Sequence, residues 1–562
     1  MGNILVLSSV HFKNDLWQRG QQLAVQLANL GNKVVFLNPV PNHSHILTTG
    51  VQDFIARRVN SPVVSDGVIQ YEMISEVKEA GGNIRELKDD WIKAIIKKHQ
   101  INKILVYLPE YVNCLKNLND PIDVYYDCVD ELSGFYPTKR VVLYEEELLK
   151  MAKGVIVTSK TLYVHKSKKN LNCILVPNAV NPEVFMESYD KPQDIISIKK
   201  PIVGYMGAIA NWFDQDLMVE VANQNKDKAF LLVGTVYTNV DKLKAVDNIY
   251  LLGTKEYNQV PAYVNHFNVG IIPFKMEDLI VNTNPIKYFE YLAAGLKTVA
   301  TPMPELIGEP YCFLTSDADS FTKQINQALG NRDRVNEQIY LQQNSWIERA
   351  KQIDDFISSR DINKSVKRNE MLREFLCVYN SYKSVSPLLE VLKAELLHEL
   401  GQLEQAKNCL FNNASLNNEC LKTQIQLILE WKYHHKLVEY MNKNEKHIYD
   451  VKQWSKLGIE FLTAYAYRNI KQINEAFGAV GQLLEKSEWI QEEIANLHFD
   501  LESYKEALKR YIYLYQKHNK LLTEEGYRNF LKLARSGKKE MLAAELERKI
   551  ADITKQKTLL NG

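Results

Sequence analysis

The sequence predicts an α/β protein with two doubly wound domains, followed by an all-α domain. Over the first 360 residues, short apolar runs alternate with amphipathic stretches, which is typical of parallel sheets covered by helices on both faces. After about residue 365 the strand signals largely disappear and helical periodicity remains. We therefore expect α/β domains over 1–180 and 181–360 and a helical domain over 365–562.

Length and composition support this organisation. A chain of 562 residues is too long for one core, and 46% hydrophobic with 24% charged residues is typical of folded soluble proteins. Lys and Arg number 69 against 68 Asp and Glu, a formal net charge of +1 without a block of like charge. Because sequence-independent nucleic-acid binding needs a basic surface, we expect no nucleic-acid partner.

The seven cysteines indicate a reducing compartment. Their number is odd and no C-x-x-C spacing occurs, so neither a zinc site nor a disulfide framework is signalled. The N-terminal apolar stretch is too short for a signal peptide, and no window of about 20 residues is apolar enough to span a bilayer. We expect a cytoplasmic protein whose membrane contacts, if any, are peripheral.

The strands of the two α/β domains can be read from the apolar runs. In the first domain they are expected at 3–8, 33–38, 69–74, 103–108, 123–127, 154–159 and 173–178, with a helix over 18–30 that ends at Gly31. A connector follows over 179–200. The second domain has strands at 201–207, 229–234, 248–253, 268–274, 297–301 and 311–314, and a helical stretch from about 335 to 359 closes it. Since ligands bind beyond the carboxyl ends of such strands, two facing domains would share one cleft.

Small residues in the last 200 positions suggest helical repeats. Ala394, Gly401 and Ala406 recur in one helical pair, and Ala495, Tyr504, Ala507 and Tyr511 sit at matching offsets in another. Ala406 and Ala507 are 101 residues apart, close to three periods of 34, and an intermediate unit fits Ala464 and Ala476. Stacked helical pairs would form a solenoid with a concave face. The alternative is an irregular helical bundle.

The densest functional signal lies between residues 271 and 306. A strand ends at Pro273, a polar loop follows, and a helix opens near Asn284 and Pro285. Exposed N–H groups at that helix start, with Lys287 one turn in, suit a diphosphate. Glu290 follows on roughly the same face, where its carboxylate can accept hydrogen bonds from a ribose diol. The alternative is that Lys287 and Glu290 form an exposed ion pair of little energetic consequence.

This segment resembles the nucleotide-sugar site of GT-B fold glycosyltransferases, in particular the retaining family with a Glu, seven residues and a second Glu. The resemblance covers about residues 1 to 360 and implies two Rossmann-like domains, a nucleoside-diphosphate sugar donor, with UDP favoured, and no metal requirement. Glu290 matches the second Glu, the family's ribose ligand, within P-x-K-x-x-E-Y-L-A-A-G. The first Glu falls at Asn282, a departure that leaves the stereochemical outcome open.

A second departure follows the first strand of the second domain. Where the family commonly has an Arg and a Lys for the diphosphate, this chain has Ala208, Ile209 and Asp214, so Lys287 and Lys275 would supply the positive charge. By the same resemblance, we expect donor contacts from Glu290, Lys287, Asn284, Asn282, Gly207, Asn211, Gly253, Thr254 and Lys275. Of these, Gly207 would allow close approach of backbone to phosphate, and Gly253 and Thr254 would contact the base.

The first domain offers candidate acceptor-side residues. Asp127, Asp130 and Glu131 follow a strand at its carboxyl end, where Asp130 and Asp127 could accept a proton or position a hydroxyl group. Alternatively, Asp130 caps the next turn or helix. The loop after the first strand adds His11 as a candidate catalytic or structural histidine, with Asp15 beside it. We expect acceptor contacts from Trp17, Arg19 and Glu131.

Three functions remain open at this stage. A concave helical domain suits a polypeptide, so the leading hypothesis is transfer of a sugar to Ser or Thr of a docked protein, a pattern that resembles bacterial flagellin-modifying enzymes with tetratricopeptide-like repeats. The runner-up is assembly of a surface polysaccharide, since the first 360 residues also resemble teichuronic-acid and capsule enzymes. The third is a non-catalytic adaptor that retains the fold.

Overall fold

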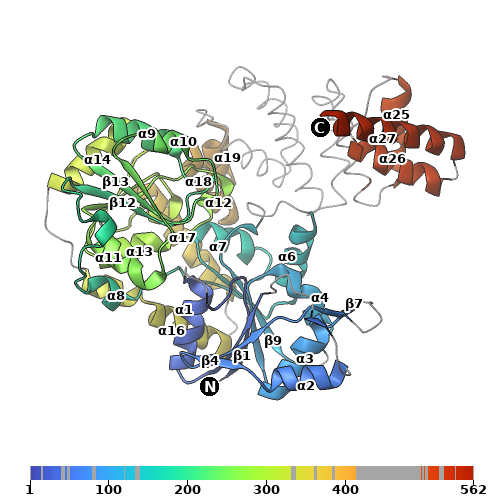
Figure 1. Cartoon of the computed structure of the whole chain (residues 1–562), viewed down its shortest axis with the longest axis horizontal. Coiled ribbons are helices and arrows are strands. Elements are labelled where there is room, and N and C mark those ends of the chain that lie inside the picture. The colour runs from blue at the N-terminus through green and yellow to red at the C-terminus, as the bar shows by residue number, and fades with distance from the viewer. Residues whose placement is uncertain are drawn as a thin grey trace. The chain divides into compact units, whose positions relative to one another are not determined.

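The structure is a computed structural model (Figure 1), and it describes most of the first 412 residues and parts of the remainder. The described residues are 2–13, 17–39, 45–46, 51–78, 84–118, 121–132, 139–330, 337–359, 364–382, 387–412, 495, 499, 504–517, 524–537 and 539–560. The chain divides into two compact units, Met1–Ser384 with Glu399–Gly401, and Val385–His398 with Gln402–Gly562. None of the described helices has the length and apolarity needed to cross a membrane.

The first sheet of the first unit contains eight strands in the order β11-β10-β9-β8-β1-β2-β5-β4. The strands are β1 (Asn3–Leu7), β2 (Lys33–Asn38), β4 (Val63–Ser65), β5 (Val68–Glu72), β8 (Lys103–Val106), β9 (Asp123–Cys128), β10 (Gly154–Val157) and β11 (Cys173–Leu175). All neighbours pair in parallel except β4 with β5. The seven predicted strands are confirmed, and the strand order reverses direction between β1 and β8.

Helices and a small second sheet complete the first α/β domain. Its helices are α1 (Arg19–Asn29), α2 (Val51–Val59), α3 (Lys88–His99), η1 (Pro109–Tyr111), α4 (Val112–Lys116), α6 (Lys139–Met151) and α7 (Lys160–Ser167). The small sheet contains β3 (His45–Ile46), β6 (Glu76–Lys78) and β7 (Ile84–Glu86). The predicted helix over 18–30 is α1, and Gly31 follows it with a positive φ of 89°.

The second α/β domain has six parallel strands in the order β14-β13-β12-β15-β16-β17. They are β12 (Ile202–Met206), β13 (Ala229–Val233), β14 (Ile249–Gly253), β15 (Val269–Ile272), β16 (Thr298–Ala300) and β17 (Cys312–Leu314), all predicted from the sequence. The order reverses between β12 and β15, the arrangement of a doubly wound nucleotide-binding fold. The apolar faces of this sheet form one continuous buried core with the helices around it.

Most helices of this domain are short. The helices are α8 (Pro182–Met186), η2 (Gln193–Ile195), α9 (Gln215–Gln224), α10 (Asp241–Lys244), η3 (Tyr257–Gln259), α11 (Val260–Asn265), α12 (Asp278–Val281), α13 (Ile286–Ala293), η4 (Pro304–Leu306), α14 (Ala318–Gly330) and α15 (Gln338–Gln343). The predicted connector over 179–200 therefore contains α8 and η2.

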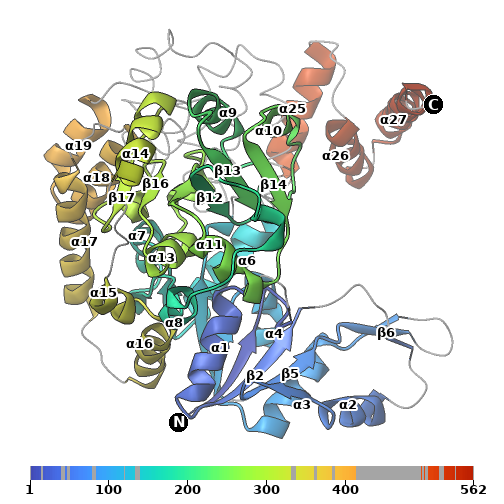
Figure 2. The same cartoon turned by 60° about the vertical axis from the view of Figure 1, so that its left-hand side comes forward.

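The helical stretch from about 335 to 359 was expected to close the second domain, but its second half packs on the first domain. It contains α15 and α16 (Trp346–Ser358), and α16 packs along α1, as Figure 2 shows. Trp346, Ala350 and Ile353 are buried in the core of the first domain, together with residues of β1 and α1. The sequence showed an amphipathic helix but not its partner, because an apolar face packs on any complementary surface within reach.

The remaining described helices have the burial expected of packed helical pairs. Of these, α17 (Lys364–Ser381) falls in the first unit, and α18 (Pro387–Glu399), α19 (Leu403–Asn412), α25 (Tyr504–Lys517), α26 (Glu524–Ser536) and α27 (Glu540–Leu560) fall mainly or wholly in the second. Ala394, Ala406, Ala495, Ala507 and Tyr511 are buried, whereas Tyr504 is exposed. The predicted intermediate unit with Ala464 and Ala476 lies outside the described residues, so the repeat architecture stays a prediction.

Candidate functional site

Two residues of the predicted donor site, Lys287 and Glu290, lie on α13, which starts beside the point where the second sheet reverses its strand order. Pro285 precedes the helix in an extended conformation, and its fixed φ suits a helix start. Tyr288, Phe289 and Tyr291 bury one side of α13 in the domain core, which fixes the helix on the sheet. The first-turn N–H groups of a helix have no acceptor within it, so this start attracts anions.

The Lys287 side chain lies over the carboxyl ends of β12 and β15. Its ammonium nitrogen is 4.7 Å from the ring centre of Phe274 and 5.6 Å from that of Tyr205. A Cβ atom at Gly207 would lie only 3.1 Å from Cε of Lys287, and Gly207 has a φ of +141° that favours glycine. The structure thus brings the predicted donor residues Lys287 and Gly207 together at the topological switch point.

Burial shapes the electrostatics of this cluster. It lowers the pKa of Lys287 to about 8, although the nearby negative charges of Glu290 and Asp130 oppose the shift. Burial also raises the pKa of the Glu290 carboxyl to about 7, against the effect of Lys287. Glu290 is only 9% exposed, and no ion pair of 4.0 Å or less joins these two described side chains. Burial of Glu290 contradicts the alternative of an exposed ion pair.

On the prediction that Lys287 holds the donor diphosphate, we expect the affinity for UDP to fall as the pH rises above about 8. Below that value Lys287 is an ammonium ion that attracts a diphosphate, and above it the neutral amine no longer does. In the limit where only the protonated form binds, the Kd rises about tenfold per pH unit above the pKa of Lys287. Calorimetric titration of UDP between about pH 7 and about 9.5 checks this. The variant Lys287→Arg, which stays charged, should flatten the profile; the same steep profile in that variant would exclude Lys287 as its source.

Asp130 extends the charged cluster from the first domain. Its Oδ1 accepts a hydrogen bond of 3.2 Å from the hydroxyl group of Thr283, which lies between α12 and α13. Burial raises the pKa of Asp130 to about 6, while Thr283, Arg19 and Lys287 oppose the shift. Asp130 and Lys287 are therefore within electrostatic reach of each other, as expected for residues on opposite sides of one site.

A buried chain of hydrogen bonds crosses between the two domains next to α13. The backbone N–H of Lys160 donates to Oε1 of Glu305 at 2.6 Å, and Oε2 of Glu305 accepts from the amide of Asn284 at 3.1 Å. Asn284 also accepts from the backbone N–H of Asn178 at 3.0 Å, and its carbonyl accepts from the Asn178 amide at 2.7 Å. Asn284, predicted to contact the donor, is thus committed to holding the start of α13 against the first domain.

Asp127 and Arg19 form a buried ion pair. The Nε of Arg19 donates to the two carboxylate oxygens of Asp127 at 3.1 and 2.9 Å, and Nη1 donates to the carbonyl of Pro177 at 3.2 Å. The side chains are 2% and 0% exposed. This geometry ties α1 to β9 and to the segment after β11, and it leaves neither side chain open to solvent.

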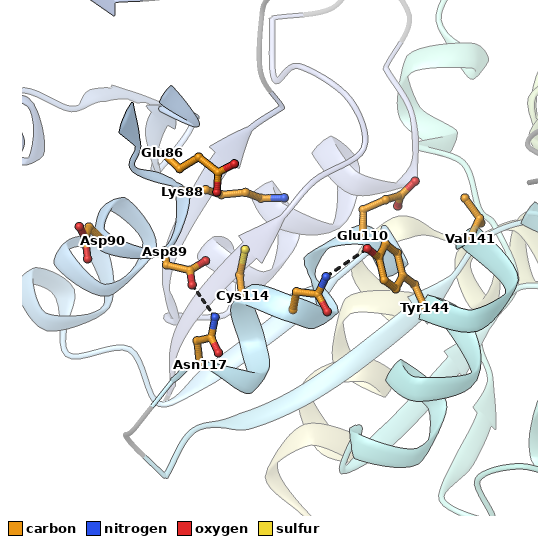
Figure 3. Close-up of a pocket in the computed structure, with 10 residues that line it drawn as sticks. Glu86, Lys88, Asp89, Asp90, Glu110, Cys114, Asn117, Val141 and Tyr144 are labelled. Atoms are coloured by element: carbon orange, nitrogen blue, oxygen red, sulfur yellow. Dashed lines mark hydrogen bonds between the residues drawn. The ribbon is translucent and has the colours of Figure 1, made fainter. Parts of the chain in front are cut away.

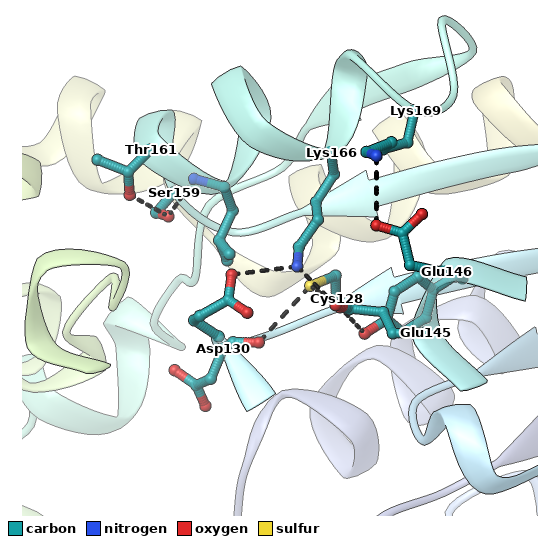
Figure 4. A network of polar contacts seen from close by, with 11 residues as sticks. Cys128, Asp130, Glu145, Glu146, Ser159, Thr161, Lys166 and Lys169 are labelled. Atoms are coloured by element: carbon teal, nitrogen blue, oxygen red, sulfur yellow. Dashed lines mark hydrogen bonds and ion pairs between the residues drawn. The ribbon is translucent and has the colours of Figure 1, made fainter. Parts of the chain in front are cut away.

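Glu131 lies in a second buried network, of which Figure 4 labels Lys166 and Glu145. Lys166 of α7 donates to Glu131 at 3.1 Å and to Glu145 at 2.9 Å, and the hydroxyl group of Tyr126 donates to Glu145 at 2.9 Å. Burial by itself would lower the pKa of Lys166, but the two carboxylates raise it well above its usual range. Because this network fixes Glu131, which follows Asp130 in the chain, Glu131 supports the segment after β9.

Of the predicted residues between β1 and α1, Trp17 and His11 lie in different surroundings. Trp17 stacks on Tyr257 of the second domain, with ring centres 6.2 Å apart and planes inclined by 13°. Gln22 donates to the Tyr257 hydroxyl group at 3.1 Å, and the charge of Glu290 contributes to the raised pKa of Tyr257, after burial. Trp17 therefore lies near the α13 cluster. His11 is 44% exposed and pairs with Glu72 at 3.6 Å, and Asp15 lies outside the described residues.

The other predicted donor residues occupy the carboxyl edge of the second sheet or its loops. Gly253 has a φ of +68° and its carbonyl accepts from Gly234, while the hydroxyl groups of Thr254 and Thr235 are 2.8 Å apart. Asn211 is exposed, and the N–H of Lys275 donates to the carbonyl of Trp212. Asn282 is buried at the end of α12. Their contacts with a donor stay predictions.

Sequence reasoning missed Tyr257, Thr283 and Glu305. Glu305 carried one signal, a lone acidic residue in an apolar stretch directly after a buried strand. Tyr257 and Thr283 carried none, since their partners lie more than 150 positions away in the chain. Among the residues that the structure describes, no group of three His, Cys, Asp or Glu side chains is arranged to hold a metal ion. Independence of metal stays a prediction.

Comparison with known proteins connects this geometry to sugar transfer. Residues 200–331 match the family model described as glycosyl transferases group 1, a segment that includes β12 to β17 and all of α13. The chain is 30% identical over 218 residues to the putative teichuronic acid biosynthesis glycosyltransferase TuaH of Bacillus subtilis, covering 35% of this chain and 55% of the relative. The chain thus spans about half the length of that curated relative. These two matches support the prediction of a glycosyltransferase enzyme.

Solved structures with similar architecture include two bacterial proteins. Sucrose-phosphate synthase of Thermosynechococcus elongatus aligns with a TM-score of 0.47 at 16% identity, over 63% of this chain and 98% of that protein. HepE of Anabaena, solved in complex with UDP and glucose, aligns with a TM-score of 0.46 at 14% identity, over 64% of this chain and all of that protein.

Proposed function

We propose that this chain transfers a sugar from a nucleoside-diphosphate sugar, preferably a UDP-sugar, to an acceptor hydroxyl group. One observation carries the proposal: a buried Glu290 and a Lys287 with a lowered pKa share the start of α13, beside the switch point of a sheet that matches the group 1 glycosyltransferase family. Ligands of doubly wound sheets bind at such switch points.

Each residue of the cluster has a role in this proposal. Lys287 and the α13 start stabilise the charge that develops on the leaving diphosphate, a contribution that grows where water is excluded. Glu290 accepts hydrogen bonds from the ribose hydroxyl groups. Asp130, on the first domain, has a pKa of about 6 and is mainly a carboxylate at neutral pH, so it can orient or accept the proton of an acceptor hydroxyl group.

Two acceptors are compatible with this donor site. The first is a protein such as flagellin, modified at Ser or Thr while it docks on the C-terminal helices. Burial of Ala394, Ala406, Ala495 and Ala507 agrees with the close helix pairing that such a docking domain needs. The second is a surface polysaccharide, in line with the printed name of the Bacillus subtilis relative. Offering both kinds of acceptor to the full-length chain with a labelled donor distinguishes them.

Replacement of Glu290 by Gln is expected to weaken UDP binding and to lower sugar transfer about 10- to 100-fold. Above its pKa of about 7 Glu290 is a carboxylate, which accepts hydrogen bonds more strongly than the amide, and hydrogen bonds to charged groups contribute about 1.5–3 kcal/mol. The measurement is UDP release from a panel of UDP- and GDP-sugars, with Glu220→Gln on the exposed side of α9 as the matched control. If the wild-type chain neither binds nor turns over any donor, a non-catalytic adaptor is the better account.

A further inference from the structure

A separate polar cavity of about 800 Å³ lies in the first α/β domain (Figure 3). Its walls come from β7, the first turn of α3, η1, α4 and α6. None of the residues that line it belongs to the predicted donor or acceptor sites. The charged residues in its wall are Glu86, Lys88, Asp89, Asp90 and Glu110.

The cavity is at the edge of the sheet where ligands of this fold bind. Glu110 lies in η1, which follows β8 directly, and β8 is one of the two strands that flank the switch point. The other neighbour of β8 is β9, whose carboxyl end leads to Asp130. The two strands run in parallel, so the cavity and Asp130 follow adjacent strand ends on one edge of the sheet.

Carboxylates outnumber ammonium groups among the described residues that line the cavity. Lys88 carries the one ammonium group among those described residues, and that group lies 4.5 Å from the ring centre of Tyr111. Burial would raise the pKa of Asp89, but hydrogen bonds from Cys114 and Asn117 and the charges of nearby lysines lower it overall, so Asp89 stays ionised. The Asn117 bond measures 2.7 Å.

Glu110 provides an independent indication of a ligand site. Its Oε2 atom is buried from solvent and receives no hydrogen bond from the described residues. Buried carboxylate oxygens are normally hydrogen-bonded, because leaving one unpaired costs the full desolvation penalty. A hydrogen-bond donor on a ligand would satisfy the Oε2 atom of Glu110. Nearby, the amide of Asn113 donates to the hydroxyl group of Tyr144 at 3.1 Å, which adds further polar groups to the same wall.

We propose that this cavity binds a hydroxyl-rich sugar without negative charge, as the part of a glycan acceptor that is remote from the reacting hydroxyl group. The proposal rests on the proposed function, and it favours a glycan over a bare polypeptide as the acceptor. Carboxylate and amide oxygens accept hydrogen bonds from sugar hydroxyl groups, and a volume of about 800 Å³ accommodates a short oligosaccharide. The described lining residues carry four carboxylates and one ammonium group, a balance that repels a uronic acid unit.

Saturation-transfer NMR on the full-length chain tests the proposal. The probes are cellotetraose and chitotetraose, which are neutral, and a galacturonic acid tetramer, which is anionic. The neutral tetramers should bind and the anionic one should not. Glu110→Ala is expected to weaken neutral-sugar binding about 10- to 100-fold, the range for a lost hydrogen bond to a charged group. Glu147→Ala, which removes an exposed carboxylate from α6, is the matched control and should bind like the wild type.

A second variant guards against loss of folding. Tyr144→Phe removes one hydroxyl group and keeps the ring, and it should also weaken sugar binding without changing the melting temperature. The proposal is overturned if neither neutral tetramer binds, if the anionic tetramer binds equally well, or if both cavity variants bind like Glu147→Ala. UDP titration of the same samples keeps the two proposals apart: UDP binding without sugar binding contradicts the cavity alone, and sugar binding without UDP binding contradicts the donor site.

Discussion

Replacement of Lys287 by Met is expected to reduce kcat for sugar transfer by about 10²- to 10³-fold, the effect of removing one preorganised group that stabilises charge in a transition state. The ammonium group sits over Phe274 and Tyr205 and beside the backbone of Gly207, where water is largely excluded. Met fills the same volume, so the loss reports on charge. The measurement is steady-state release of UDP with the preferred donor.

The stability of Lys287→Met shows whether a loss of activity comes from lost catalysis or from lost folding. Burial lowers the pKa of Lys287 to about 8, so at neutral pH the folded protein holds an ammonium group that would be better solvated in the unfolded chain. Lys287→Met should therefore raise the free energy of unfolding while activity falls. Lys242→Met, at an exposed ion pair with Asp216, should change neither. Wild-type kcat in Lys287→Met would remove the lysine from the mechanism.

Replacement of Asp127 by Ala is expected to lower the free energy of unfolding by about 3–5 kcal/mol, the cost of leaving a buried charge without its partner. Arg19 would keep its contact with Pro177 but lose both bonds to the carboxylate in an environment that solvent does not reach. Urea denaturation monitored by fluorescence measures the change. Asp123→Ala removes an exposed partner of Lys153 and should cost about 1 kcal/mol or less.

A paired replacement decides between a structural and a catalytic Asp127. The double variant Arg19→Met with Asp127→Leu should recover most of the lost stability, because apolar residues of similar size often replace a buried ion pair at little cost. It should also recover sugar transfer if the pair only supports the fold. A double variant that is as stable as the wild type but inactive would instead place Asp127 or Arg19 in the reaction.

The strands that the sequence revealed and those that it concealed differ in burial. All thirteen predicted strands are confirmed, and most are fully buried runs such as Val203–Tyr205 or Phe230–Leu232. The four strands of the described residues that were missed are two or three residues long, and in β4 both Val63 and Val64 are exposed. Short strands at a sheet margin are held by pairing with a neighbour and need no apolar pattern of their own.

The candidate site likewise contains features that the sequence predicted and contacts that it did not. Lys287 and Glu290 could be predicted because a proline, a lysine and a glutamate within six residues define one helix start, and helix geometry fixes how their side chains are spaced. Contacts between Arg19 and Asp127, 108 positions apart, and between Asn284 and Asn178, 106 positions apart, left no mark on the local pattern. Of the residues predicted to face the cleft, Arg19, Asp127 and Asn284 therefore support the fold from buried positions. Lys287, Glu290 and Asp130 form the charged cluster.

The amino-acid sequence by itself determined the thirteen longer or more buried strands, the two α/β domains and the helix that carries Lys287 and Glu290, because local periodicity and turn chemistry encode these features. Only the tertiary structure decided which domain α16 packs on, which described carboxylates form ion pairs and where a cavity rich in carboxylates forms. Those outcomes depend on burial and on pairing between distant residues. The free energy of a charge is set by the groups that surround it in space, and its neighbours in the chain reveal few of them.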